Sequence, residues 1–256
     1  MYYWRIFKKT GLLPAFLLFC NLVMAQDLHF YGLDPTFNQT GRISKRLDYN
    51  LLVFSIVDAF NQKISGVEYP ATDLVLYVQP SIIYTYSPNL NFAASYTYQR
   101  NNPFNNNYVN EHLLWQQAVL ALPVGRGKIT NRFRFVEAFI EDRQANKYPL
   151  STILRYQIGF NMPLQGPTLE EKEFYLSTSN EFYFSLTGKK NATYSQNITV
   201  AGVGYYMGKA GKLELGYYQD ILVRNKQKDL RFLHMAQISW ITKFDFFSKK
   251  KDETEK

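Results

Sequence analysis

The chain has 256 residues, a formal net charge of +8 and an aromatic content of 17%, with 20 Tyr and 20 Phe against 3 Trp. This length suits one large domain or one barrel, and the many aromatic residues favour strands. The positive charge does not indicate a nucleic-acid partner, because no run of Lys and Arg is interleaved with a recognisable binding motif.

The first 25 residues have the pattern of a cleavable signal peptide. Three basic residues precede an apolar run that ends on Val23-Met24-Ala25, where small or tolerated residues permit cleavage. A retained membrane anchor is the alternative, but the apolar run is short for a spanning helix and contains Pro14. We therefore expect an exported chain that begins at Gln26. The only cysteine, Cys20, would leave with the signal, which excludes disulfide and thiol chemistry.

Beyond residue 25 the sequence predicts strands. No stretch approaches the roughly 20 apolar residues of a spanning helix, and apolar and polar residues alternate over many short segments. The clearest hairpin joins 74–86 to 90–99 through Ser87-Pro88-Asn89. Further strands are expected at 27–39, which Pro35 interrupts, and at 48–60, 111–122, 128–141, 150–162, 173–186, 194–206, 212–221 and 230–247.

The expected connections alternate in length. Short turns at 87–89, 123–127 and 207–211 alternate with longer polar loops at 61–71, 100–110, 142–148, 187–193 and 223–229. Only the connection at 163–172 is long where this alternation predicts a short turn. Bacterial outer-membrane barrels combine short periplasmic turns with long outer loops.

These patterns predict an all-β fold: an antiparallel, up-and-down transmembrane β-barrel of 10 to 12 strands at residues 26–247, preceded by the signal peptide at 1–25. Ten strands are counted from Asp48, and the segment before it makes an eleventh. Because single-chain bacterial barrels have even strand numbers, ten or twelve strands are expected.

The last predicted strand ends on aromatic residues. Trp240, Phe244 and Phe246 share one face of it, which resembles the terminal signal that the barrel-assembly machinery recognises, and we expect these side chains to contact that machinery. The charged tail at 248–256 is expected to be a disordered periplasmic appendage. The alternative is an ordinary edge strand of a soluble sheet.

Five charged residues, Arg132, Arg134, Arg155, Glu181 and Glu214, fall on the more polar faces of their strands. An Arg exposed to lipid costs about 2–4 kcal/mol, so we expect these residues to face inward and to pair across strands. They would form a selectivity or binding site. The favoured alternative is a narrow barrel that fills its interior with paired polar groups.

The sequence contains no catalytic or metal-binding pattern. His29, His112 and His234 lie on distant segments without the spacing of metal ligands. His234 and Ser239 have opposite parity on one strand, so they do not form a Ser-His pair. Glu137 falls on the face of its strand opposite to that of the arginines, although a bulge would return it inward. We expect no cofactor, no metal and no enzyme activity.

A resemblance to a known family rests on five segments in this order: EHLLWQQAVL, RFRFVEAFIE, LRYQIGFNMPL, FYLSTSNEFYFSL and VGYYMGKAGKLELGYYQ. Together they resemble an uncharacterised family of outer-membrane β-barrels from Bacteroidota, known as a domain of unknown function. The resemblance extends from about Asp48 to Trp240. It implies an outer-membrane barrel and supplies no activity.

The resulting expectation is a monomeric protein of the cell outer membrane, in contact with outer-membrane lipid and lipopolysaccharide. Its role would be structural, adhesive or the passage of small solutes. The alternatives are a lipid-modifying outer-membrane enzyme and a soluble secreted β-sandwich that binds a ligand.

Overall fold

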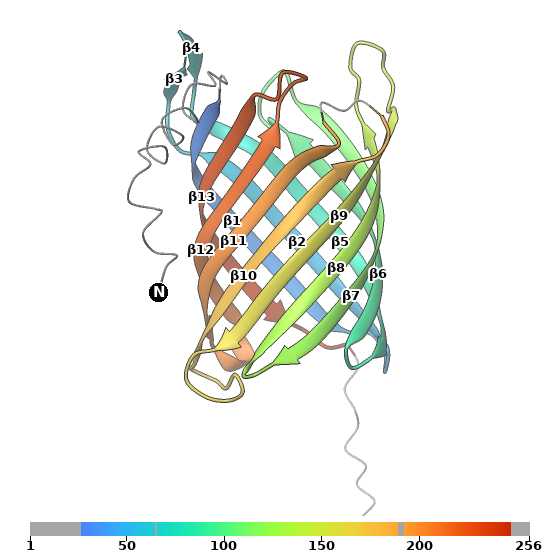
Figure 1. Cartoon of the computed structure of the whole chain (residues 1–256), viewed down its shortest axis with the longest axis vertical. Helices are drawn as coiled ribbons and strands as arrows, with labels where there is room; N and C mark the ends of the chain where they lie inside the picture. Colours follow the sequence, from blue (N-terminus) through green and yellow to red (C-terminus); the bar gives the residue numbers. More distant parts are fainter. Residues whose placement is uncertain (1–26, 65, 189–191, 247–256) are drawn as a thin grey trace, which may run out of the picture.

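Eleven long strands wind around a common axis and close into a barrel (Figure 1). The computed structural model describes residues 27–64, 66–188 and 192–246. The predicted signal peptide and charged tail lie outside these residues. The strands of the wall are β1 (Leu28–Arg42), β2 (Leu47–Asp58), β5 (Thr72–Ser87), β6 (Leu90–Asn101), β7 (Val109–Val124), β8 (Gly127–Ile140), β9 (Leu150–Pro163), β10 (Phe174–Ser185), β11 (Tyr194–Tyr206), β12 (Lys212–Val223) and β13 (Leu230–Lys243).

The barrel closes where β1 pairs with β13 in parallel. The predicted all-β barrel of 10 to 12 strands is confirmed, but the expectation of an even number is wrong, because the segment before Asp48 forms a complete strand. When strands alternate in direction, the first and the eleventh run the same way, and they can close the barrel only by parallel pairing. The other neighbouring strands of the wall pair antiparallel.

Two prolines lie inside strands of the wall. Pro35 has a partner on β13, but the ladder between β1 and β2 skips it. Pro80 likewise has a partner on β2, while the ladder between β5 and β6 skips it. Proline has no N–H to donate, so one ladder opens at each position while the other continues. Pro35 therefore does not interrupt β1, contrary to the sequence expectation.

The two faces of each strand differ as the alternation predicts. On β5, Tyr77, Gln79 and Ser81 are buried, whereas Ile82 and Tyr84 are exposed. Side chains of successive residues point to opposite faces of a sheet, so every strand of the wall presents one row to the lumen and one to the outside.

The connections sort by length onto the two ends of the barrel. One end, the short-turn end, has the connections 43–46, 88–89, 125–126 and 207–211, together with the longer segment 164–173; the other, the long-loop end, has 59–71, 102–108, 141–149, 186–193 and 224–229. A small hairpin of β3 (Gln62–Ile64) and β4 (Val67–Tyr69), which the sequence did not predict, projects from the long-loop end (Figure 1). Within the described ranges, no helix is long and apolar enough to cross a membrane.

Candidate functional site in the barrel lumen

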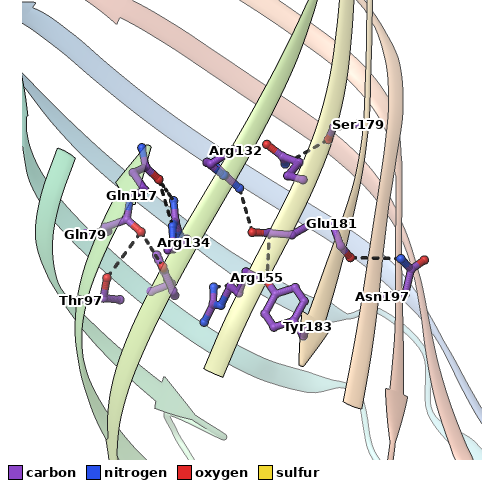
Figure 2. Close-up of polar contacts among 12 residues, drawn as sticks. Gln79, Thr97, Gln117, Arg132, Arg134, Arg155, Ser179, Glu181, Tyr183 and Asn197 are labelled. Atoms are coloured by element: carbon purple, nitrogen blue, oxygen red, sulfur yellow. Dashed lines mark hydrogen bonds and ion pairs between the residues drawn. The ribbon is translucent and has the colours of Figure 1, made fainter. Parts of the chain in front are cut away.

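Four of the five predicted charged residues line one cavity of about 650 Å³ inside the barrel: Arg132 and Arg134 of β8, Arg155 of β9 and Glu181 of β10. These three strands are consecutive neighbours in the wall, and the four residues occupy inward positions. Their side chains gather on one wall of the lumen (Figure 2). We call this group the charged wall.

Only one pair of opposite charges in the charged wall is in contact. The Arg132 Nη2 atom lies 3.0 Å from Glu181 Oε1, and Glu181 is only 6% exposed. The Tyr183 hydroxyl donates to the second carboxylate oxygen of Glu181 at 3.2 Å (Figure 2). A buried carboxylate requires such partners because burial without them is costly. Glu181 therefore has both of its oxygens engaged.

The other two arginines do not pair with a carboxylate. Arg134 donates from Nε and Nη2 to Gln117 Oε1, at 3.1 and 2.9 Å, and its guanidinium lies 4.0 Å from the ring centroid of Trp115. Arg155 lies 4.4 Å from the centroid of the Tyr183 ring. No carboxylate oxygen of the described residues lies within 4.0 Å of either guanidinium. The expectation of pairing across strands is thus wrong for Arg134 and Arg155.

Glu214, the fifth predicted residue, faces inward but belongs to another group nearer the short-turn end. It accepts a hydrogen bond of 2.7 Å from the buried Tyr175 hydroxyl. The Tyr175 ring lies against Gly204, where any Cβ atom would collide with it. Lys212 Nζ lies 5.1 Å from the centroid of the same ring. These four residues, which we call the floor cluster, partly fill the lumen below the charged wall.

The rest of the interior is less polar than the sequence suggested. Two clusters of buried apolar side chains also line the interior, one around Leu233 and Met235 and one around Trp115 and Val136, next to Arg134. A second ion pair, Arg231 Nη2 to Asp220 Oδ2 at 3.5 Å, also faces the cavity. The lumen is therefore a restricted cavity between charged and apolar walls.

Several of these lumen residues were missed from the sequence. Gln117, Tyr183, Asp220 and Arg231 all line the cavity. Tyr183 and Asp220 share strand parity with residues that were selected, Glu181 and Glu214. Counting every second position on each strand would have found them. Which of these groups meet depends on the register between strands, for which a single sequence carries no signal.

The expectation about the histidines is corrected in one respect. His29 and His234 are 205 residues apart in sequence, yet His29 Nδ1 lies 3.1 Å from His234 Nε2 across the parallel pair of β1 and β13. The Tyr217 hydroxyl contacts the other ring nitrogen of His234. His112 bonds to Tyr96 on another part of the wall. No group of three or more possible metal ligands occurs in the described part of the chain.

Some outward positions are polar. Asn180, Thr199, Gln219 and His234 are successive partners across β10 to β13 and form one outward row in the half of the wall nearer the long-loop end. Glu137 also points outward, because β8 pairs with both of its neighbours without a bulge. The suggestion that a bulge returns Glu137 to the lumen is therefore wrong.

The aromatic residues at the end of β13 lie on the outside of the short-turn end. Trp240, Phe244 and Phe246 are 49%, 54% and 71% exposed. The backbone N–H groups of Phe244 and Phe246 donate to carbonyl groups of β1, at 2.8 and 2.9 Å, and continue the pairing beyond the end of the strand. Their contact with the barrel-assembly machinery stays a prediction.

The fold and the lumen define a class: a closed β-barrel with an apolar outer surface and a restricted interior cavity lined in part by arginine. More particularly, residues 67–231 match the family model described as "Protein of unknown function (DUF2490)", and the chain belongs to that family. The resemblance to a domain of unknown function is therefore confirmed, whereas an origin in Bacteroidota stays a prediction. Comparisons with curated proteins and with solved structures gave no match.

Proposed function

We propose that this protein is an integral, monomeric β-barrel of the bacterial outer membrane whose lumen gives limited access to small solutes. The observation that carries the proposal is the apolar outside of a closed wall. Outward residues from many strands are large, apolar and well exposed, among them Leu33, Ile82, Leu114, Leu120, Phe133, Leu154, Ile158, Val203, Leu215 and Ile238. Apolar surface of this extent marks a membrane or protein contact, and a closed barrel satisfies its backbone polar groups without water.

The ends of the apolar surface support the same proposal. At the short-turn end, outward aromatic side chains form contacting pairs: Tyr86 with Phe92, Phe174 with Tyr205, and Phe37 with Trp240. Aromatic girdles of this kind mark the interfaces of outer-membrane barrels. Toward the long-loop end, the row from Asn180 to His234 limits the purely apolar zone. The two boundaries fit a band of lipid contact between them.

The lumen favours limited passage over a wide pore. Its cavity of about 650 Å³ lies above the floor cluster, and apolar clusters occupy other parts of the interior. A small barrel has an interior that side chains nearly fill. The proposal includes no catalytic role, and the absence of enzyme activity and the contacts with lipid and lipopolysaccharide stay predictions. A β-sandwich does not fit the closed sheet.

The proposal predicts behaviour in membranes that a soluble protein lacks. Cells that express the full chain are fractionated, the membranes are washed with alkaline carbonate, and the protein is run on gels with and without boiling. We expect it to stay with the outer-membrane fraction and to migrate differently when unheated, because a folded barrel resists detergent. Release by carbonate together with the absence of a heat-dependent shift would refute the proposal.

A further inference from the structure

We propose that the lumen contains a binding site for a small oxyanion, meaning the carboxylate, phosphate or sulfate group of a solute, between Arg134 and Arg155. This inference rests on the proposed function, because it names the class of solute that the lumen of the membrane barrel accepts.

The register places two arginines at directly opposite positions of adjacent strands. Arg134 and Arg155 are direct Cα partners on β8 and β9, and both side chains line the cavity. Like charges directly opposite each other destabilise a sheet, and charges interact more strongly in a protein interior than in water. Glu181, the nearby carboxylate of the charged wall, is already bound by Arg132 and Tyr183. An anion between the two arginines would remove the repulsion.

Donor groups in the charged wall remain unused. The Nε atoms of Arg155 and Arg132 are buried without a hydrogen-bond partner. Arg134 donates from two nitrogens to a single neutral oxygen, Gln117 Oε1. Buried donors without acceptors are unusual and costly. A ligand that carries several acceptor oxygens would satisfy them.

The two guanidinium groups are held in place by their surroundings. Gln117 and the Trp115 ring orient Arg134, and the Tyr183 ring lies under Arg155. Side chains that are already ordered lose less freedom when they bind a ligand. Guanidinium groups match the geometry of carboxylate and phosphate with paired hydrogen bonds. The cavity in front of them, about 650 Å³, lies within the usual range for small-molecule sites.

The test uses the full chain folded in detergent micelles and inorganic phosphate as the probe. Phosphate is titrated calorimetrically at constant ionic strength, with chloride as the balancing anion, and sulfate and acetate form the parallel arms. We expect saturable binding of at least one of these oxyanions. Arg134→Gln and Arg155→Gln should each weaken binding by about tenfold, because each removes charge-assisted hydrogen bonds.

Lys212→Gln is the matched control, because it also removes one positive charge from the lumen but lies in the floor cluster. We expect its affinity to stay within about twofold of the wild type, since it makes no hydrogen bond to a ligand at the charged wall. An equal loss of affinity in all three variants would mean that the positive charge of the lumen attracts anions without a specific site, and it would overturn the inference. Absence of saturable binding by the wild type in every arm would also overturn it.

The two proposals fail in distinguishable ways. Each variant is first checked for heat-dependent gel mobility, so that a misfolded protein is not scored as a binding defect. If both arginine variants misfold, the titrations of the wild type with phosphate, sulfate and acetate against chloride still test the inference. A barrel that integrates into membranes but binds no oxyanion leaves the proposed function intact. A protein that binds phosphate saturably, but is released by carbonate and shows no heat-dependent shift, refutes the membrane proposal alone.

Discussion

Glu181 is the acidic residue of the charged wall. It lies among three arginines, contacts one of them at 3.0 Å and is almost fully buried. Parity along β10 was enough to place this residue on the polar face of its strand. Its partner was not predictable, because Arg132 and Glu181 are on β8 and β10 and meet across the intervening β9.

Replacing this carboxylate should destabilise the barrel strongly. Glu181→Gln removes the ion-pair partner of Arg132, and removing one partner of a buried ion pair typically costs about 3–5 kcal/mol. The free energy of unfolding is measured by urea titration of the protein in lipid vesicles, with tryptophan fluorescence as the signal.

The double variant Arg132→Gln with Glu181→Gln is the control for this prediction. It removes both members of the pair, so the loss of stability should be smaller than in Glu181→Gln alone. Wild-type stability of Glu181→Gln would contradict the role assigned to the carboxylate.

At the scale of the element, β1 decides how the barrel closes. The sequence expected a possible strand at 27–39 with an interruption at Pro35. The structure instead contains 15 continuous residues, Leu28–Arg42, paired on both sides. The low strand propensity of Pro35 did not break the strand. A proline lacks only its own N–H donor, so the ladder opens at one position on one side, and β13 still pairs with the strand on the other side.

A disulfide between β1 and β13 tests this closure. Leu33 and Ala236 are direct Cα partners on β1 and β13 and face outward. In a background with Cys20 replaced by Ser, the double variant Leu33→Cys with Ala236→Cys should form a disulfide under mild oxidation, because directly paired strand positions lie within bonding range. Non-reducing gels would detect it as a reducible shift in mobility.

The off-register pair Leu33→Cys with Ile238→Cys is the matched control. Its cysteines are displaced by two residues along the strand, beyond the separation of about 7 Å that a disulfide tolerates. Equal cross-linking of both pairs, or of neither, would argue against the parallel register.

At the scale of the whole molecule, the odd number of strands places the start of the first strand and the end of the last strand at opposite ends of the barrel. β1 begins at the long-loop end and β13 finishes at the short-turn end, and both run in the same direction (Figure 1). Under the proposed function, the long loops face the cell exterior and the short turns face the periplasm.

Cysteine labelling on intact cells tests this orientation. Asn107 is exposed in a long loop and Asn89 in a short turn. In the background without Cys20, a membrane-impermeant maleimide should modify Asn107→Cys and spare Asn89→Cys until the outer membrane is permeabilised. The reverse pattern would show an inverted barrel, and labelling of both in intact cells would contradict a membrane location.

The sequence by itself determined the class of fold, the two faces of the strands and the lengths of the connections. These features are local: side chains alternate with a period of two residues, and turns depend on a few neighbouring residues such as Ser87-Pro88-Asn89. Parity alone therefore suffices to place Arg134, Arg155 and Glu181 on one face of the sheet.

Only the tertiary structure decided how these local features meet. Three features join residues that are distant in sequence. They are the parallel pairing of β1 with β13, the contact of His29 with His234, and the division of the arginines into one with a carboxylate partner and two without one. Such contacts depend on the register around a closed sheet, where a shift of one residue on any strand moves every side chain to the other face. That register is a property of all eleven strands together.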